Sequence, residues 1–189
     1  MRYFELRWAP DHSSVAGRPG TSFAGLGIAR FSRAQLVDRA QVHGAVPLVQ
    51  KDKARKLTDF CFALDFVPVV SARVADILRR VAGEDAQLFE AEIEGRQEPR
   101  FLVNVAHASD CMDEVRGKVE RIPPQEMDRF PGADRYRNVW RLMVDPDRVG
   151  DHHLFRVDGY LRVSIIASEN LVRALEGIGA TGIAPYPVS

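Results

Sequence analysis

The stretch with the most side chains that could do chemistry lies at residues 104–121, NVAHASDCMDEVRGKVER, directly after a run that predicts a buried strand. Cys111, His107 and a neighbouring carboxylate could form an activated thiol, so one hypothesis is a hydrolase-like enzyme using Cys111 and His107. The alternative is that Cys111 is a small buried hydrophobic side chain, because free cysteine usually lies in the interior. No known nucleophile motif surrounds Cys111, which favours the alternative.

A second polar stretch, residues 129–141 (RFPGADRYRNVWR), interleaves arginine with aromatic residues. These types anchor protein partners and also stack on nucleic-acid bases. Trp140 falls on the apolar face of a predicted strand, so we expect it in the core. The carboxylates of the first stretch are expected to face solvent or to begin a helix, where negative charge is favourable. The candidate partner-binding residues are Asp110, Asp113, Glu114, Arg129, Arg135, Tyr136 and Arg137.

His152 and His153 are adjacent and could suggest a metal site. They fall in a predicted strand, where neighbouring residues point to opposite faces, so the two rings cannot easily share one ion. The sequence also contains no HxH or HExxH spacing, no G-x-S-x-G, no Walker loop and no dinucleotide fingerprint. We therefore expect no metal site, no cofactor and no catalytic residues.

The balance of charge limits the classes of partner. The 189 residues carry 26 basic and 26 acidic side chains, for a formal net charge of zero. This argues against a protein that binds nucleic acid by neutralising phosphates, and the basic run KDKARK at 51–56 is interpreted as a solvated strip. A nucleic-acid-associated protein using that run and the arginine–aromatic stretch is kept as a weaker alternative.

Targeting signals are also missing from the pattern. The first residues, MRYFELRW, alternate polar and apolar side chains and do not resemble a signal peptide. The longest apolar run, 60–70, is interrupted by Asp65 and Pro68 and is too short to span a bilayer. With no C-x-x-C pair among its two cysteines, we expect a cytoplasmic protein that does not act at a membrane.

Two segments that must form the scaffold share one hydrophobic spacing. Apolar residues follow Ser71 at positions 74, 77, 78 and 81, and follow Ser168 at the same offsets. Each serine is placed to cap a helix whose i, i+3, i+4, i+7 spacing builds one buried face. Gly83 and Gly179 are placed to end these helices. The sequence thus predicts a Ser-capped helix followed by a strand, occurring twice.

The whole pattern predicts an α+β fold with a mixed or mainly antiparallel sheet and about three helices. Asp158-Gly159 is typical of a two-residue hairpin turn. The C-terminal run IAPYPV contains two prolines without N–H groups and is expected at a sheet edge. The other expected strands are 3–8, 89–94, 101–105, 138–144, 152–157 and 160–166.

The chain before residue 58 is expected to hold a strand, a mobile glycine-rich loop at 9–27 and a helix at 33–43. Ser32 and Gln35 match a capping box for that helix, with Phe31 and Leu36 at the staple positions. We expect residues 1–57 to pack on a main domain formed by residues 58–189.

Three blocks occur in order along the chain: DFVPVVSARVADILR (65–79), NVAHASDCMDEVRGKVER (104–121) and HHLFRVDGYLRVSIIASENLVRALEGIGATGIAPYPV (152–188). They contain an S-x-R-x-x-x-x-L helix, a central NV…D..D segment and a closing FR…S..L…L…G.TG…P run. In these features the chain resembles the immunity protein 11 family of bacterial polymorphic-toxin systems, over about residues 58–188. Gly117 departs from the pattern, which often has serine there.

The resemblance implies a cytoplasmic protein that binds and neutralises a cognate toxin, in many members the product of an adjacent gene. It carries over no enzymatic residues, and it implies that 58–189 is an immunity-protein-like α+β domain. Inhibition by occlusion needs a complementary surface of about 20–30 residues with a few anchoring side chains, which a chain of this size can supply.

Overall fold

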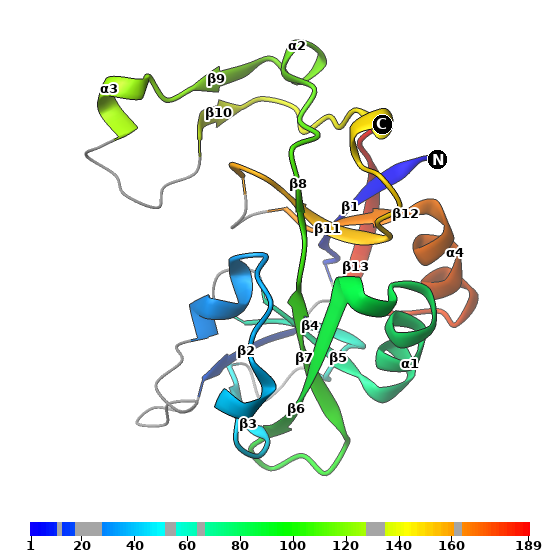
Figure 1. Cartoon of the computed structure of the whole chain (residues 1–189). Coiled ribbons are helices and arrows are strands. Elements are labelled where there is room, and N and C mark those ends of the chain that lie inside the picture. The colour runs from blue at the N-terminus through cyan, green and yellow to red at the C-terminus, as the bar shows by residue number, and fades with distance from the viewer. Residues whose placement is uncertain (11–12, 18–27, 52–55, 64–66, 128–134, 161–163) are drawn as a thin grey trace.

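A closed six-stranded barrel and an open five-stranded sheet form the framework of the protein (Figure 1). The computed structural model describes residues 1–10, 13–17, 28–51, 56–63, 67–127, 135–160 and 164–189. Its helices and mixed sheets confirm the predicted α+β class. The strands are β1 (Tyr3–Trp8), β2 (Ser13–Gly17), β3 (Val46–Gln50), β4 (Phe60–Phe62), β5 (Pro68–Ser71), β6 (Ala86–Ile93), β7 (Arg100–Val105), β8 (Ala108–Ser109), β9 (Val119–Arg121), β10 (Tyr136–Val139), β11 (Leu154–Val157), β12 (Ile166–Ser168) and β13 (Ile183–Pro187). The helices are α1 (Ala72–Val81), α2 (Glu114–Gly117), α3 (Pro124–Met127) and α4 (Glu169–Gly177), with 3₁₀ turns η1 (Ile28–Ser32), η2 (Arg39–Gln41), η4 (Gly83–Asp85) and η5 (Pro146–Arg148).

The barrel has the strand order β2-β3-β6-β7-β5-β4. Its neighbours are antiparallel except for β2 with β4 and β3 with β6. Every strand contributes to one buried cluster, because alternate side chains of a strand point to the same face. That cluster includes Val15, Leu48, Cys61, Val69, Phe89 and Leu102. On β6 the glutamates between the buried residues face solvent, as the alternation predicted.

The five-stranded sheet has the order β13-β1-β12-β11-β8. Only β8 and β11 pair in parallel. β13, which contains Pro185 and Pro187, lies at the edge as predicted, because a proline cannot donate to a second neighbouring strand. β1 lies between β12 and β13, and β2 and β3 belong to the barrel, so the first 57 residues supply strands to both sheets.

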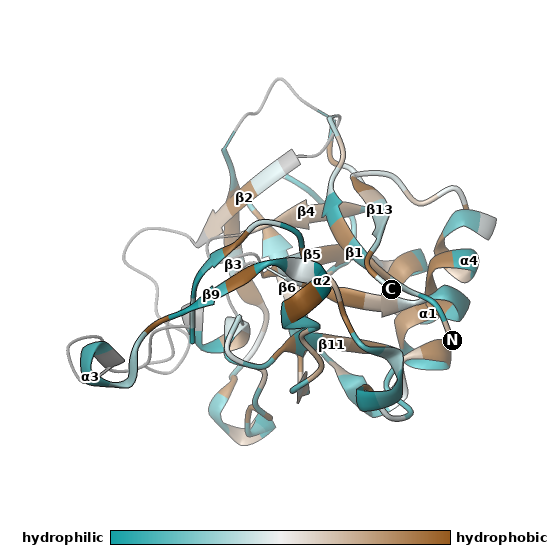
Figure 2. Cartoon of the chain, turned by 90° about the horizontal axis from the view of Figure 1, so that it is seen from above, coloured by the Kyte–Doolittle hydropathy of each residue, from teal (hydrophilic) through white to brown (hydrophobic). Residues whose placement is uncertain are grey.

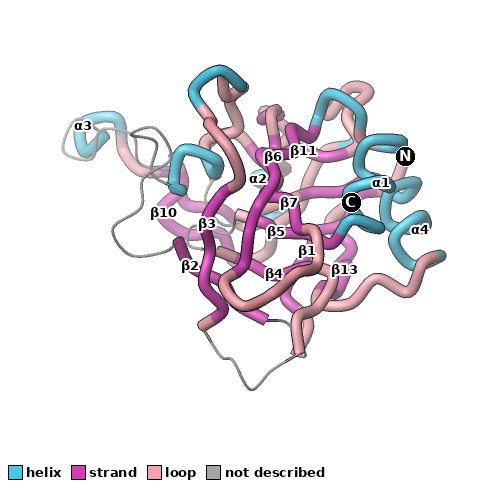
Figure 3. Tube along the Cα trace, turned by 90° about the horizontal axis from the view of Figure 1, so that it is seen from below, coloured by secondary structure: helices cyan, strands magenta, loops and turns pink. Residues whose placement is uncertain are grey.

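The repeated helix–strand unit is present. α1 is followed by β6, α4 is followed by β13, and the two helices pack side by side against both sheets (Figure 3). The Ser168 hydroxyl accepts a hydrogen bond from the Leu171 N–H at 3.3 Å, as a capping serine should. Ser71 occupies the matching position, but its hydroxyl donates to Asp59 Oδ1 at 2.8 Å. The predicted cap bond is wrong there, because the Ser71 side chain is oriented toward Asp59 and makes no hydrogen bond to the first turn of α1.

The helix predicted at 33–43 is wrong. Ala34 has a left-handed φ of +50°, and the segment contains only the 3₁₀ turn η2, with η1 ending just before it at Ser32. The side chain of Gln87 on β6 accepts from the Val37 N–H at 2.8 Å and donates to the Val37 carbonyl at 3.1 Å. Asn104 Nδ2 on β7 donates to the Gln35 carbonyl at 2.8 Å. These amides bind backbone groups that a helix would need, and Leu36, expected to staple the helix, is exposed.

Three further boundaries differ from the prediction. β2 lies inside the segment expected to be a loop at 9–27, of which residues 11–12 and 18–27 lie outside the described part. The strand expected at 138–144 ends at Val139, and the β11 strand begins at Leu154, after the two histidines. The Asp158-Gly159 turn forms, with the Tyr160 N–H donating to the Val157 carbonyl at 2.9 Å.

That turn does not continue into a regular hairpin. A two-residue turn at 158–159 would place Phe155 opposite position 162, whereas its partner is Ile166. The strand expected at 160–166 therefore begins at Ile166 in the described residues, and positions 161–163 lie outside them.

A separate two-stranded sheet, β9 with β10, stands away from the two main sheets. Figures 1 and 2 show α3 at its far end, on the opposite side of the molecule from α1 and α4. We call residues 113–127 and 135–141 the arm. Among the described residues, no helix is long and apolar enough to cross a membrane.

Candidate functional site

The candidate partner-binding residues gather at the arm and its base. Asp110 lies between β8 and α2, Asp113 and Glu114 begin α2, and Arg135–Arg137 enter β10. Arg129 lies outside the described residues. The arm is attached to the body through backbone bonds, from the Arg135 N–H to the Gly159 carbonyl at 2.8 Å and from the Asp113 N–H to the Met143 carbonyl at 2.9 Å. The structure therefore brings together residues that the sequence placed in two separate stretches.

A chain of ion pairs crosses the base of the arm. Arg135 Nη2 lies 2.5 Å from Asp158 Oδ2 and 3.4 Å from Asp110 Oδ1. The second oxygen of Asp110 lies 2.8 Å from Arg148 Nη2. All four side chains are between a third and three-fifths exposed, so each pair contributes little to stability but remains accessible to a partner.

Glu114 joins α2 to the two strands of the arm. It accepts from Arg121 Nε at 2.9 and 3.0 Å and from the Tyr136 hydroxyl at 3.1 Å. The hydrogen bond from Arg121 holds the pKa of Glu114 below its usual range. Burial, together with the negative charge of Glu114, raises the pKa of Tyr136. The Tyr136 ring is buried, so it holds the arm in place and presents little surface.

The N-terminus of α2 is fixed by Asp113. Its carboxylate accepts from the Arg116 N–H at 2.9 Å and from Arg116 Nε at 2.5 Å, and these bonds lower the pKa of Asp113. This confirms the expectation that an acidic residue begins a helix here. Farther out, Arg137 is paired with Glu126 and lies 3.5 Å from Glu120.

Two apolar side chains on the arm are unusually exposed. Val115 on α2 is 88% exposed and Trp140, directly after β10, is 67% exposed. The Arg141 N–H donates to the Gly117 carbonyl at 3.1 Å, so these two turns of the chain lie against one another. The expectation that Trp140 lies in the core is wrong, because the strand that would have turned it inward ends one residue earlier. Residue alternation alone gave no signal of this exposure.

Cys111 does not have the environment of a nucleophile. It is fully buried in the cluster that contains Tyr3, Met112 and Val188. Burial raises its pKa to about 11, so the thiol stays protonated near neutral pH. His107, its proposed partner, instead stacks on His152, with ring centroids 4.6 Å apart.

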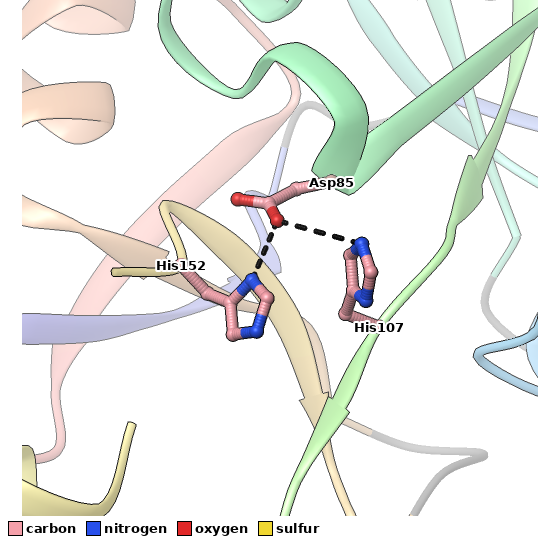
Figure 4. A group of neighbouring side chains, drawn as sticks. All are labelled: Asp85, His107 and His152. Carbon is pink, nitrogen blue, oxygen red and sulfur yellow. Dashed lines mark hydrogen bonds and ion pairs between the residues drawn. The ribbon is translucent and has the colours of Figure 1, made fainter. Parts of the chain in front are cut away.

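Asp85, His107 and His152 form a compact group that sequence reasoning missed (Figure 4). Asp85 Oδ1 lies 2.7 Å from His152 Nδ1 and 3.9 Å from His107 Nε2. His153 turns to a different partner, with its Nδ1 2.7 Å from the Ser168 hydroxyl. The two adjacent imidazoles thus have different side-chain partners. Residues far apart in the sequence supply the neighbours of His152 instead.

The sequence matches the model of a known protein family. The sequence profile described as "Immunity protein family (Imm11)" matches residues 11–189, nearly the whole chain. No curated protein matches it.

Proposed function

Since this chain belongs to the immunity protein family Imm11, we propose that it binds a cognate bacterial toxin directly and neutralises it by covering a surface the toxin needs. The toxin is expected to be the product of an adjacent gene, and binding is expected in the cytoplasm. No catalytic step by the immunity protein is required, because occlusion depends only on a complementary surface and a slow dissociation rate.

We place the binding surface on the arm. Its two exposed apolar side chains, Val115 and Trp140, are the observation that carries this assignment. Tryptophan and arginine are enriched among the few residues that dominate binding energy, and a partner gains most by burying a large exposed ring. Arg137 and Arg141 lie close to Trp140 in the chain and are exposed, which supplies the polar rim that such an anchor needs.

The charges of the arm favour a protein partner over a nucleic acid. Arg121, Arg135 and Arg137 are each paired with a carboxylate of this chain. A phosphate backbone would have to compete with these carboxylates and would meet their repulsion. A protein surface with both signs of charge can instead extend the existing pairs. The other candidates, Asp110, Asp113 and Glu114, would serve as acceptors for basic side chains of the toxin.

The environment of Cys111 supports a non-enzymatic role. A buried thiol with a raised pKa is a poor nucleophile, and the histidine proposed to activate it has other partners. The hydrolase hypothesis therefore has no assembled Cys–His pair to use among the described residues.

The test is co-expression and purification with the product of the adjacent gene. We expect growth rescue and a stable complex on gel filtration. Trp140→Ala should weaken binding about 30-fold or more, because truncating a central tryptophan commonly costs at least about 2 kcal/mol. Arg137→Glu, as a separate variant, should also weaken toxin binding, because it reverses a charge on the rim.

A matched control is Leu36→Ala, which removes a similarly exposed apolar side chain (64%) from the segment that Gln87 and Asn104 bind, away from the arm. It should bind within about threefold of the native chain. If the complex forms and both arm variants bind with unchanged affinity, the interface lies elsewhere on the protein. Absence of any complex and of growth rescue would refute the proposed partner itself.

A further inference from the structure

We propose that Asp85, His107 and His152 bind a divalent transition metal ion, with zinc the ion that best suits the set. Two imidazoles and one carboxylate are common zinc ligands, and three protein ligands leave one position for water. One ligand atom from each residue lies within 4.8 Å of those of the other two. This proposal is independent of toxin binding and does not involve the arm.

The two distances from Asp85 to the imidazole nitrogens lie on either side of the ligand-to-ligand spacing that a bound zinc ion requires. Zinc bonds of 2.0–2.2 Å in a tetrahedral site place ligand atoms about 3.3–3.5 Å apart. The carboxylate oxygen of Asp85 is 2.7 Å from one imidazole nitrogen and 3.9 Å from the other. An ion bound by all three residues therefore needs the first pair to open and the second to close, each by roughly half an ångström. The two imidazole nitrogens, which lie within 4.8 Å of one another, must reach the same spacing.

At least one of the two rings must also rotate out of the stacked arrangement. The two imidazoles lie face to face with planes 26° apart, whereas a bound ion lies in the plane of each ring. Their side chains are 37% and 35% exposed, which leaves room for this rotation at the surface. Figure 4 shows the Asp85 carboxylate directed toward both rings.

The carboxylate is held in place by a second set of bonds. Asp85 Oδ2 accepts from the backbone N–H groups of His153 at 2.7 Å and Leu154 at 3.1 Å, so Oδ1 remains directed at the imidazoles. Such outer bonds orient metal ligands and strengthen binding. Asp85 is also buried, and a buried carboxylate gains from a nearby cation.

The fold fixes the three backbones relative to one another. Ala86 pairs with Val105 at the start of β6 and the end of β7, and the Ala106 N–H donates to the Asp85 carbonyl at 2.8 Å. The Arg156 N–H donates to the His107 carbonyl at 2.9 Å, where β11 meets β8. The site therefore lies where the barrel joins the five-stranded sheet. A bound ion would fasten these two sheets together.

The experiment uses the tag-free full-length chain, stripped with a chelator and dialysed, and titrated with Zn²⁺ by calorimetry and thermal unfolding. We expect one ion per chain and a rise in Tm of about 5–10 °C at a hundredfold excess over Kd. Loaded with Co²⁺, the protein should show the visible spectrum of a four-coordinate nitrogen and oxygen site.

His107→Ala and His152→Ala should each weaken binding by at least tenfold, and His43→Ala, which removes an exposed histidine elsewhere, should leave it unchanged. His107→Ala is the decisive variant, because Asp85→Asn also alters bonds to the backbone of the fold; circular dichroism of the metal-free variants checks folding. Zinc binding that survives in His107→Ala and His152→Ala, or a sulfur-to-cobalt absorption band, would overturn the assignment. The absence of zinc binding to the native chain at about 100 µM zinc would also overturn the assignment.

Discussion

Arg73 and Thr181, which belong to the two copies of the repeated unit, donate hydrogen bonds to the same carboxylate. Asp59 accepts from Arg73 Nε at 2.7 Å and Nη2 at 2.5 Å, and from Thr181 N at 3.0 Å and Oγ1 at 2.9 Å. Arg73 also reaches the carbonyls of Ile178 at 2.9 Å and Gly179 at 3.1 Å, at the end of α4. The S-x-R and G-x-T-G patterns therefore meet at one point and fix the two helices together.

The pKa of Asp59 makes this junction sensitive to acid. Burial alone would raise that pKa, but hydrogen bonds from Arg73, Thr181 and Ser71 outweigh burial and hold it well below its usual range. In the unfolded chain the carboxyl titrates near 3.9, roughly its ordinary value. The stabilisation is therefore complete above the unfolded pKa and is lost as pH falls toward the folded pKa.

We expect Asp59→Asn to lower the free energy of unfolding by about 2 kcal/mol at pH 7. The difference between variant and native chain should shrink between about pH 5 and pH 2, measured by urea unfolding at each pH. Asp76→Asn on α1, whose side chain is 69% exposed, is the control and should change stability little. An equal difference at every pH would contradict the assignment.

Gly182 is expected to tolerate no side chain. Its φ is +91°, and a Cβ there would lie 2.2 Å from the Phe60 carbonyl oxygen. Gly182→Ala should destabilise the fold by about 3 kcal/mol or more. Gly179 has a φ of +60° with nothing within 4 Å of the added Cβ, so Gly179→Ala should cost only about 1 kcal/mol. Equal losses in Tm would mean that backbone conformation, not the close contact, limits both positions.

Gly117 is expected to reject the serine that is common in the family pattern. A Cβ there would lie 2.7 Å from the Arg141 carbonyl oxygen, where α2 meets the chain beyond β10. Gly117→Ser should lower stability by about 1–3 kcal/mol and loosen the arm, seen as faster amide exchange at 113–121. Gly177→Ser, at an open helical position, is the matched substitution and should be neutral or slightly stabilising. If Gly117→Ser leaves stability unchanged, the arm can move enough to make room for the added side chain.

Cys111 should react slowly in the folded protein. Its pKa of about 11 and its burial keep the reactive thiolate scarce at pH 8. We expect iodoacetamide to alkylate Cys111 at least about 100-fold more slowly in the native than in the urea-unfolded chain, with the site identified by mass spectrometry. Rapid native labelling of Cys111 would instead revive the thiol-enzyme hypothesis.

The local patterns of the chain were sufficient where neighbours in sequence decide the structure. The spacing after Ser71 and Ser168 predicted α1 and α4, and the alternation along β6 predicted its solvent-exposed and buried faces. Pro185 and Pro187 predicted the edge position of β13. In each case the signal is a helical or strand period, or a missing N–H group, which acts within the element itself.

The same reasoning failed where a distant partner changed the outcome. The capping box at Ser32 predicted a helix, but side-chain amides from Gln87 and Asn104 hold the following backbone in another conformation. Trp140 matched a strand pattern, yet its strand ends at Val139 and leaves the ring exposed. No periodicity within a short window contains these competing partners.

By itself, then, the sequence determined the α+β class, the repeated Ser-capped helix and its strand, and the family to which the chain belongs, because these depend on short-range spacing and shared motifs. Only the tertiary structure decided which polar groups meet. It separated Cys111 from His107, assembled Asp85 with two histidines, and joined Arg73 and Thr181 at Asp59. Such meetings depend on how sheets and helices pack, which brings together side chains that no sequence interval links.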